Sequence, residues 1–249
     1  NDTLRMAEGL ERLMLDGRYP IVRRLVHGLQ FCDVIETCRL ARLRSDDFAE
    51  LLSLLESTAM EGAGELFGDR SPPDRTASLM FRHAALEFLR LHPRFVVEES
   101  WGGRWRMALN SLTLARGKGC VPRIDPSSPQ ATFEDLECPL GHLGETVLRP
   151  VTAYFEGAAA SKQYAILGRR GWSIVESFRA LALSHAVSLW MLRLVSAERA
   201  PEAEDAIGVV AAIDRGQVIG ALSGRRHRKR VGSVARRGEL ARLVAWYAR

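Results

Sequence analysis

Apolar residues recur along the chain at intervals of three and four, the spacing of an amphipathic α-helix, and alternating strand patterns are nearly absent. Asp74 can cap one such helix, His92-Pro93 stops it, and Ser45-Asp46-Asp47 precedes another. The predicted helices cover residues 3–15, 21–35, 48–60, 75–92, 105–116, 145–167, 172–197, 201–213 and 225–249. The last is one helix, or two short ones broken near Gly232 or Gly238. The pattern therefore predicts an all-α chain, a multi-helix orthogonal bundle forming a single helical domain over residues 1–249.

Residues 117–144 interrupt the helical pattern with four prolines, at positions 122, 126, 129 and 139. We predict a long irregular loop here, at which the domain has a loose subdivision. The pairs Gly117/Gly119 and Gly168/Gly171 follow helical patterns, not strands. They are therefore interpreted as helix ends that need a positive φ, and not as phosphate-binding loops.

The segment Trp172–Ala197 is apolar almost all round, which is typical of a helix buried in the middle of a domain. Its charge-free part, Ala180–Leu192, is shorter than the ~20 residues that a spanning helix needs. We therefore predict no membrane segment and a cytoplasmic protein. The chain begins at Asn1 without an initiator methionine, so a further segment upstream is an open alternative.

The net charge of +5 comes from 35 basic residues, of which only three are lysine. Such an arginine bias is typical of a GC-rich genome, so the position of the charge is more informative than its total. The densest cluster is a candidate binding face made of Arg225, Arg226, Arg228, Lys229 and Arg230. No aromatic residue interleaves it for base stacking, which makes nucleic acid the less favoured partner. A solvated helix face, or a dock for an acidic segment, is the favoured alternative.

Four cysteines, Cys32, Cys38, Cys120 and Cys138, are too widely spread for a disulfide framework, so we expect reduced thiols. Cys120, Cys138 and His142 share the irregular segment, but a zinc site needs four ligands and usually a close cysteine pair. We therefore expect neither a metal site nor a cofactor in this chain.

No assembled catalytic motif is present, and the catalytic residues stay unknown. Glu176, Arg179 and His185 lie in the most apolar helix and are candidates to line a pocket, with Tyr154, Gln163 and Tyr164 before them. The alternative, which we favour, is a structural ion pair and a satisfied core histidine.

The stretch Thr152–Arg193, with its glycine turn and G-W-S-I-V-E-S-F-x-A-L-A-L, resembles the helical region of the flagellin lysine-N-methylase-like cysteine-cluster family. The arginine-rich end Arg236–Arg249, Gly17–Pro20 and the loop Pro122–Gly141 fit the same layout. The resemblance implies a helical domain that shapes a substrate groove, with flagellin as a protein substrate. It also implies AdoMet and a metal or iron–sulfur cluster in a longer protein.

The hallmark of that family is a C-x-x-C-x-x-C-C cluster before the helical region, and no cysteine of this chain matches it. We therefore carry over no catalytic residue, and expect this chain by itself to be an inactive domain of a methylase-like protein. The alternative is a helical protein- or nucleic-acid-binding module that uses the basic C-terminal face. A structural or oligomerising protein is a third possibility.

Overall fold

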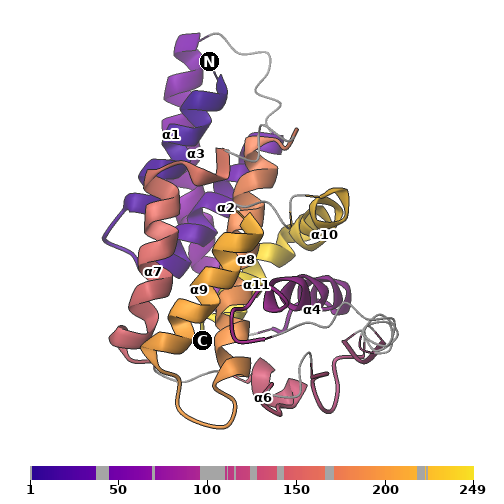
Figure 1. The fold of residues 1–249 in the computed structure, drawn as a ribbon. Helices are drawn as coiled ribbons and strands as arrows, with labels where there is room; N and C mark the ends of the chain where they lie inside the picture. Colours follow the sequence, from indigo (N-terminus) through magenta and orange to yellow (C-terminus); the bar gives the residue numbers. More distant parts are fainter. Residues whose placement is uncertain are drawn as a thin grey trace.

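The computed structural model describes residues 2–37, 45–68, 71–95, 110, 112–114, 116–123, 128–138, 143–165, 171–217, 222 and 224–249, and confirms an all-α multi-helix bundle (Figure 1). Its helices are α1 Asp2–Leu15, α2 Ile21–Thr37, α3 Ser45–Gly68, α4 Arg75–Leu89, α6 Phe133–Glu137, α7 Glu145–Ala160, α8 Ile174–Val195, α9 Ala203–Gln217, α10 Arg225–Ala235, the 3-10 helix η3 Arg236–Gly238 and α11 Glu239–Tyr247. Within these ranges the extended backbone amounts to one isolated antiparallel bridge, Cys120 to Thr132.

Helix α8 runs through the centre of the bundle, as the apolar pattern predicts (Figure 1). Only Glu176 and Arg179 among its residues are not buried. The other helices surround it: α7 and α9 lie on one side, and α4, α10 and α11 on another (Figure 1). Helix α2 also packs directly on α8, and α1 and α3 pack on α2. The buried side chains form one cluster from Ala7 to Tyr247.

Helix α8 also meets the length and apolar composition of a membrane-crossing helix, because its charges lie near its two ends. The sequence expectation that no segment is long enough was therefore wrong. However, 94% of its most apolar stretch is buried by the other helices. Among the described residues it is the only helix with this length and composition.

Several helix ends lie where the sequence places them. Asp74 caps α4 by accepting a hydrogen bond from the Ala77 N–H at 2.6 Å. The basic C-terminal stretch is two helices, and the break is at Gly238, whose φ of +74° is one that glycine adopts without strain. Gly117, Gly119 and Gly171 also have positive φ, as predicted. Gly168 and most of the helix predicted at 105–116 lie outside the described residues.

Several boundaries differ from prediction. Helix α7 ends at Ala160 and not at residue 167, and α9 continues to Gln217. Helix α3 continues through Gly62 and Gly64 to Gly68. The segment 117–144 is not wholly irregular: it contains α6, which begins with a capping box between Thr132 and Asp135. Phe133 and Leu136 of α6 are buried in the common core, because the short helix presents its apolar side to the bundle.

Candidate functional site

The three predicted pocket residues on α8 lie in three different environments. Glu176 closes a capping box at the start of α8: the Ser173 N–H donates to its carboxylate at 2.8 Å, and the Glu176 N–H donates to Ser173 Oγ at 3.1 Å. Arg228 of α10 donates to the same carboxylate at 2.9 and 2.8 Å. Burial opposes ionisation, but the hydrogen bonds from Arg228 and Ser173 outweigh it and lower the pKa of Glu176. Glu176 thus joins α8 to α10.

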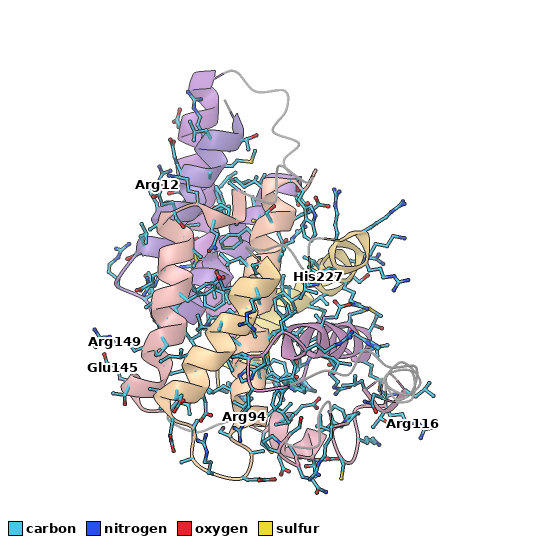
Figure 2. All side chains as sticks on the ribbon, in the orientation of Figure 1. Arg12, Arg94, Arg116, Glu145, Arg149 and His227 are labelled. Carbon is cyan, nitrogen blue, oxygen red and sulfur yellow. The ribbon has the colours of Figure 1, made fainter. Side chains whose placement is uncertain are left out.

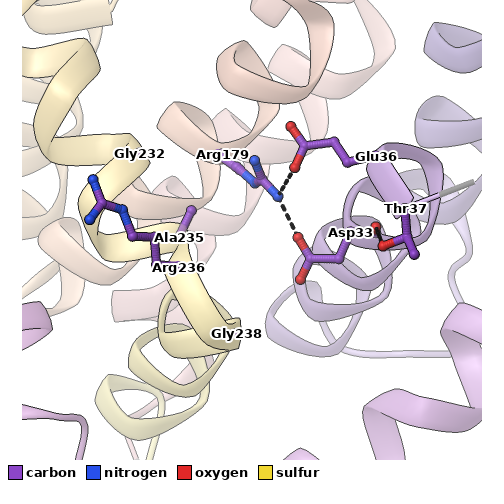
Figure 3. Close-up of a pocket in the computed structure, with 8 residues that line it drawn as sticks. All are labelled: Asp33, Glu36, Thr37, Arg179, Gly232, Ala235, Arg236 and Gly238. Atoms are coloured by element: carbon purple, nitrogen blue, oxygen red, sulfur yellow. Dashed lines mark hydrogen bonds and ion pairs between the residues drawn. The ribbon is translucent and has the colours of Figure 1, made fainter. Parts of the chain in front are cut away.

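Arg179 lies three residues further along α8 and does not pair with Glu176. It donates to Asp33 at 2.5 Å and to Glu36 at 2.8 Å, both on α2 (Figure 3). Together with Arg236 of η3 they line a cavity of about 530 Å³ between the end of α2 and the α10–η3 turn. In Figure 3 the Arg236 guanidinium points away from the two carboxylates. The two carboxylates are therefore held by Arg179 within the fold, and Arg236 takes no part in this pairing.

His185 is buried in the core, with 1% of its surface exposed. Its ring meets Phe155 edge-on, with a centroid separation of 4.9 Å. Its Nδ1 has no hydrogen-bond partner among the described residues, so it is not the satisfied core histidine of the favoured interpretation. Burial alone lowers its pKa to about 4, and the imidazole is therefore neutral at pH 7. Tyr164, predicted to lie nearby, instead donates to the Ala7 carbonyl at 3.0 Å.

The residues of the predicted basic face fall into two groups, those that form ion pairs within the fold and those that do not. Arg228 pairs with Glu176, and Arg230 pairs with Glu87 of α4. These two arginines hold α10 against the bundle. Arg225, Arg226 and Lys229 are exposed and have no ion pair with a described residue. Arg236, which directly follows α10, is likewise exposed and unpaired within the described part of the chain. We call these four residues the α10 ridge, and Figure 2 shows nitrogen-tipped side chains projecting from this helix into solvent.

A second group of cations lines a cavity of about 490 Å³ at the start of α4, and we call this cavity the basic pocket. Its walls come from the start of α4, the turn after Arg116, α6 and the end of α11. The ionisable side chains that line it are Arg75, Arg82, Arg116, Lys118, Glu137 and Tyr247, with Ser78 and Trp246 beside them. Among the described residues, four cations face one carboxylate, so these side chains give the pocket a net positive charge.

Arg82 forms the floor of the basic pocket, and its side chain is only 9% exposed. Its Nε donates to Glu137 Oε1 at 2.9 Å, and its guanidinium also lies 5.3 Å from the centre of the Phe133 ring. Gly117, at φ +59°, passes so close that a Cβ there would overlap the guanidinium. Arg82 and Glu137 therefore brace each other, whereas Arg75, Arg116 and Lys118 have no ion pair with a described residue.

The α10 ridge and the basic pocket lie along one pair of helices. Glu87, near the end of α4, contacts His227 and Arg230 near the start of α10. At the other end of α4, the Asp74 N–H donates to Glu239 just after η3, at 2.9 Å. Helices α4 and α10 therefore run antiparallel, and the basic pocket lies beyond the end of α10 where Arg236 is found. Sequence reasoning missed this pocket, because its cations come from residues 75, 82, 116 and 118, which form no run.

The structure describes three of the four cysteines. Cys120 and Cys138 are exposed, Cys32 is buried, and Cys38 and His142 lie outside the described residues. No group of three or more His, Cys, Asp or Glu side chains within the described ranges is placed to hold a metal ion.

The cysteine environments predict a selective reaction with iodoacetamide. Burial raises the pKa of the Cys32 thiol far above its usual value, so this thiol stays protonated and shielded. We expect the native protein to be alkylated at Cys120 and Cys138 and to leave Cys32 intact until the chain is unfolded in guanidinium. Peptide mass spectrometry after each treatment measures this. Labelling of Cys32 as fast as Cys120 in the native protein would contradict the packing around α2.

Comparison of the chain with protein-family models, with curated proteins and with solved structures finds no match. The resemblance to lysine-N-methylase-like proteins therefore stays a prediction.

Proposed function

We propose that this protein is a helical binding module for an acidic protein segment, held by the α10 ridge with one anionic group seated in the basic pocket. The observation that carries the proposal is the excess of cations in that pocket, where four cationic side chains surround one carboxylate. Arg228 and Arg230 already have partners within the fold. The cations left over are therefore the ones that an external anion would neutralise.

The spacing of the ridge suits an extended acidic chain. Arg225 begins α10, Lys229 lies about one turn further along, and Arg236 directly follows the helix, so the three residues span its length of about 16 Å. Arg75, Arg116 and Lys118 continue the positive charge at the far end of α4. Arginine supports such binding because its planar guanidinium makes two parallel hydrogen bonds to one carboxylate or phosphate.

An acidic protein segment is favoured over single-stranded nucleic acid because nucleic-acid grooves combine cations with several stacking aromatic rings. Among the described residues that line the basic pocket, Trp246 is the only aromatic residue besides the buried Tyr247. The Arg249 guanidinium already lies 5.1 Å from the centre of the Trp246 ring. The exposed positions of the α10 ridge carry no aromatic residue.

The test is fluorescence anisotropy with a labelled oligoglutamate peptide, titrated between about 0.05 and about 0.2 M salt. We expect saturable binding that weakens as salt rises, and an affinity at least tenfold lower in the triple variant Arg75→Ala/Arg116→Ala/Lys118→Ala. Arg225→Ala/Arg226→Ala/Lys229→Ala tests the ridge in the same way and should weaken binding to a similar extent.

Arg149→Ala is the matched control for Arg116→Ala, because Arg149 is an exposed arginine on α7, at the opposite edge of the molecule from Arg116 in Figure 2. It should leave the affinity unchanged. A labelled oligothymidylate measured in parallel separates the two kinds of partner. Tighter, salt-steep binding of the oligonucleotide would replace the proposal with a nucleic-acid module, and no binding of either probe would refute it.

The second candidate function is the one that the resemblance implies, a helical domain of a lysine-N-methylase-like protein acting on flagellin. The all-helical fold is what supports it. A metal or iron–sulfur centre would have to be held by a cysteine cluster that these residues lack, and AdoMet would supply the methyl group. Incubating the chain with labelled AdoMet and flagellin should therefore transfer no methyl group, and transfer by this chain alone would place catalysis within it.

A further inference from the structure

A separate cavity of about 160 Å³ lies between the starts of α2 and α7, the middle of α8 and the end of α11. Its wall is mainly aliphatic, built from Ile21, Val22, Leu148, Val151 and Leu189. It shares Tyr247 with the basic pocket, but none of the free cations of that pocket line it. An apolar cavity of about 150 Å³ in another protein is large enough to admit benzene. The size and the wall therefore suit one small aromatic ring.

The polar group in this wall is unusual. His185 lines the cavity, is almost completely buried, and its Nδ1 meets no hydrogen-bond partner among the described residues. A buried polar atom without a partner is unfavourable, and native proteins leave few of them unless the group has a role. Phe155 packs edge-on against the imidazole. Thr152, Tyr247 and Arg249 also line the cavity, so a molecule in it meets a few polar groups within a mainly aliphatic wall.

We propose that this cavity is a binding site for a small neutral hydroxylated aromatic molecule of the phenol class, whose ring fills the aliphatic chamber and whose hydroxyl group hydrogen-bonds His185. A neutral imidazole has one donor and one acceptor nitrogen, and a hydroxyl group can serve either. Most of the wall is aliphatic and offers little compensation for the lost hydration of an ion, so we expect the ligand to bind in its neutral form. The site is independent of the basic pocket and of the function proposed for it.

The test compares phenol with toluene, which has a methyl group in place of the hydroxyl. Binding is followed by isothermal titration calorimetry and by NMR of the Ile21, Leu148 and Val151 methyl groups. We expect phenol to shift these methyl signals and the His185 ring nitrogens. Toluene should bind roughly tenfold more weakly, because it makes no hydrogen bond to the imidazole.

Two variants separate the ring contact from the hydrogen bond. His185→Leu should bring phenol and toluene to nearly equal affinity, because only the imidazole distinguishes them. Val151→Phe should abolish the binding of both molecules by filling the chamber. The control is Ile207→Ala, at an exposed residue of α9, which should leave binding unchanged. Thermal unfolding checks that each variant is folded. If Val151→Phe does not fold, the methyl shifts in the unmodified protein still test whether phenol binds in the cavity.

Equal affinity of the unmodified protein for phenol and toluene would overturn the role of His185. Absence of any methyl shift at the solubility limit of phenol would overturn the site itself.

Discussion

Replacing Gly28 with alanine is expected to lower the free energy of unfolding by about 1–3 kcal/mol, the range for overpacking a core. Gly28 lies in the middle of α2, where that helix crosses α8. A Cβ at this position would overlap the Phe178 ring. That ring is fully buried, so it can move only by displacing other side chains of the core. The two helices would have to move apart, and chemical denaturation followed by circular dichroism measures the loss.

The matched control is Gly157→Ala on α7. Gly157 is also inside a helix, but it is exposed and a Cβ there meets nothing within 4 Å. Alanine is the better helix former, so this variant should gain about 0.5–1 kcal/mol. Combining Gly28→Ala with Phe178→Leu should recover part of the loss, because the smaller side chain makes room. Equal stability of the two alanine variants would show that α2 and α8 are not in close contact at Gly28.

Acid should destabilise this protein between about pH 6.5 and pH 4, because two buried histidines resist protonation in the folded state. Burial is the main cause that lowers the pKa of His185 and of His92 from 6.5 to about 4 in each case. Below pH 6.5 these histidines bind protons in the unfolded chain but not in the folded protein. The free energy of unfolding therefore falls as the pH is lowered, until the folded-state pKa is reached. Each shift corresponds to roughly 3 kcal/mol when complete.

Denaturant unfolding at a series of pH values checks this expectation. His185→Leu should flatten the stability curve between pH 6.5 and pH 4, and His92→Leu should do so independently, since Gly208 and Phe95 pack around that ring elsewhere in the fold. The carboxyls of Glu176 and Asp205, whose pKa values are lowered, lose their stabilisation at lower pH. A wild-type curve that is flat from pH 6.5 to pH 4.5 would contradict the burial of both histidines.

Part of the candidate site was within reach of sequence reasoning and was missed. Ser173 and Glu176 have the S-x-x-E spacing of a capping box, so the role of Glu176 at the start of α8 has a local signature. The second partner of Glu176 has no local sequence signature. Arg228 is far away in the chain and reaches Glu176 only because α10 packs on α8. The division of the basic run into paired and free cations follows from that packing.

The sequence by itself determined the all-α class of the fold, because helix formation depends on residues close together in the chain. The period of apolar residues, the Asp74 cap, the Gly238 break and the nearly unbroken apolar character of α8 each depend on neighbours within a few positions. The tertiary structure alone decided which charges are neutralised, where the cations of residues 75, 82, 116 and 118 converge, and that His185 borders a cavity. These depend on contacts between helices distant in the chain, and periodicity determines which face of a helix is buried but not which helix covers it.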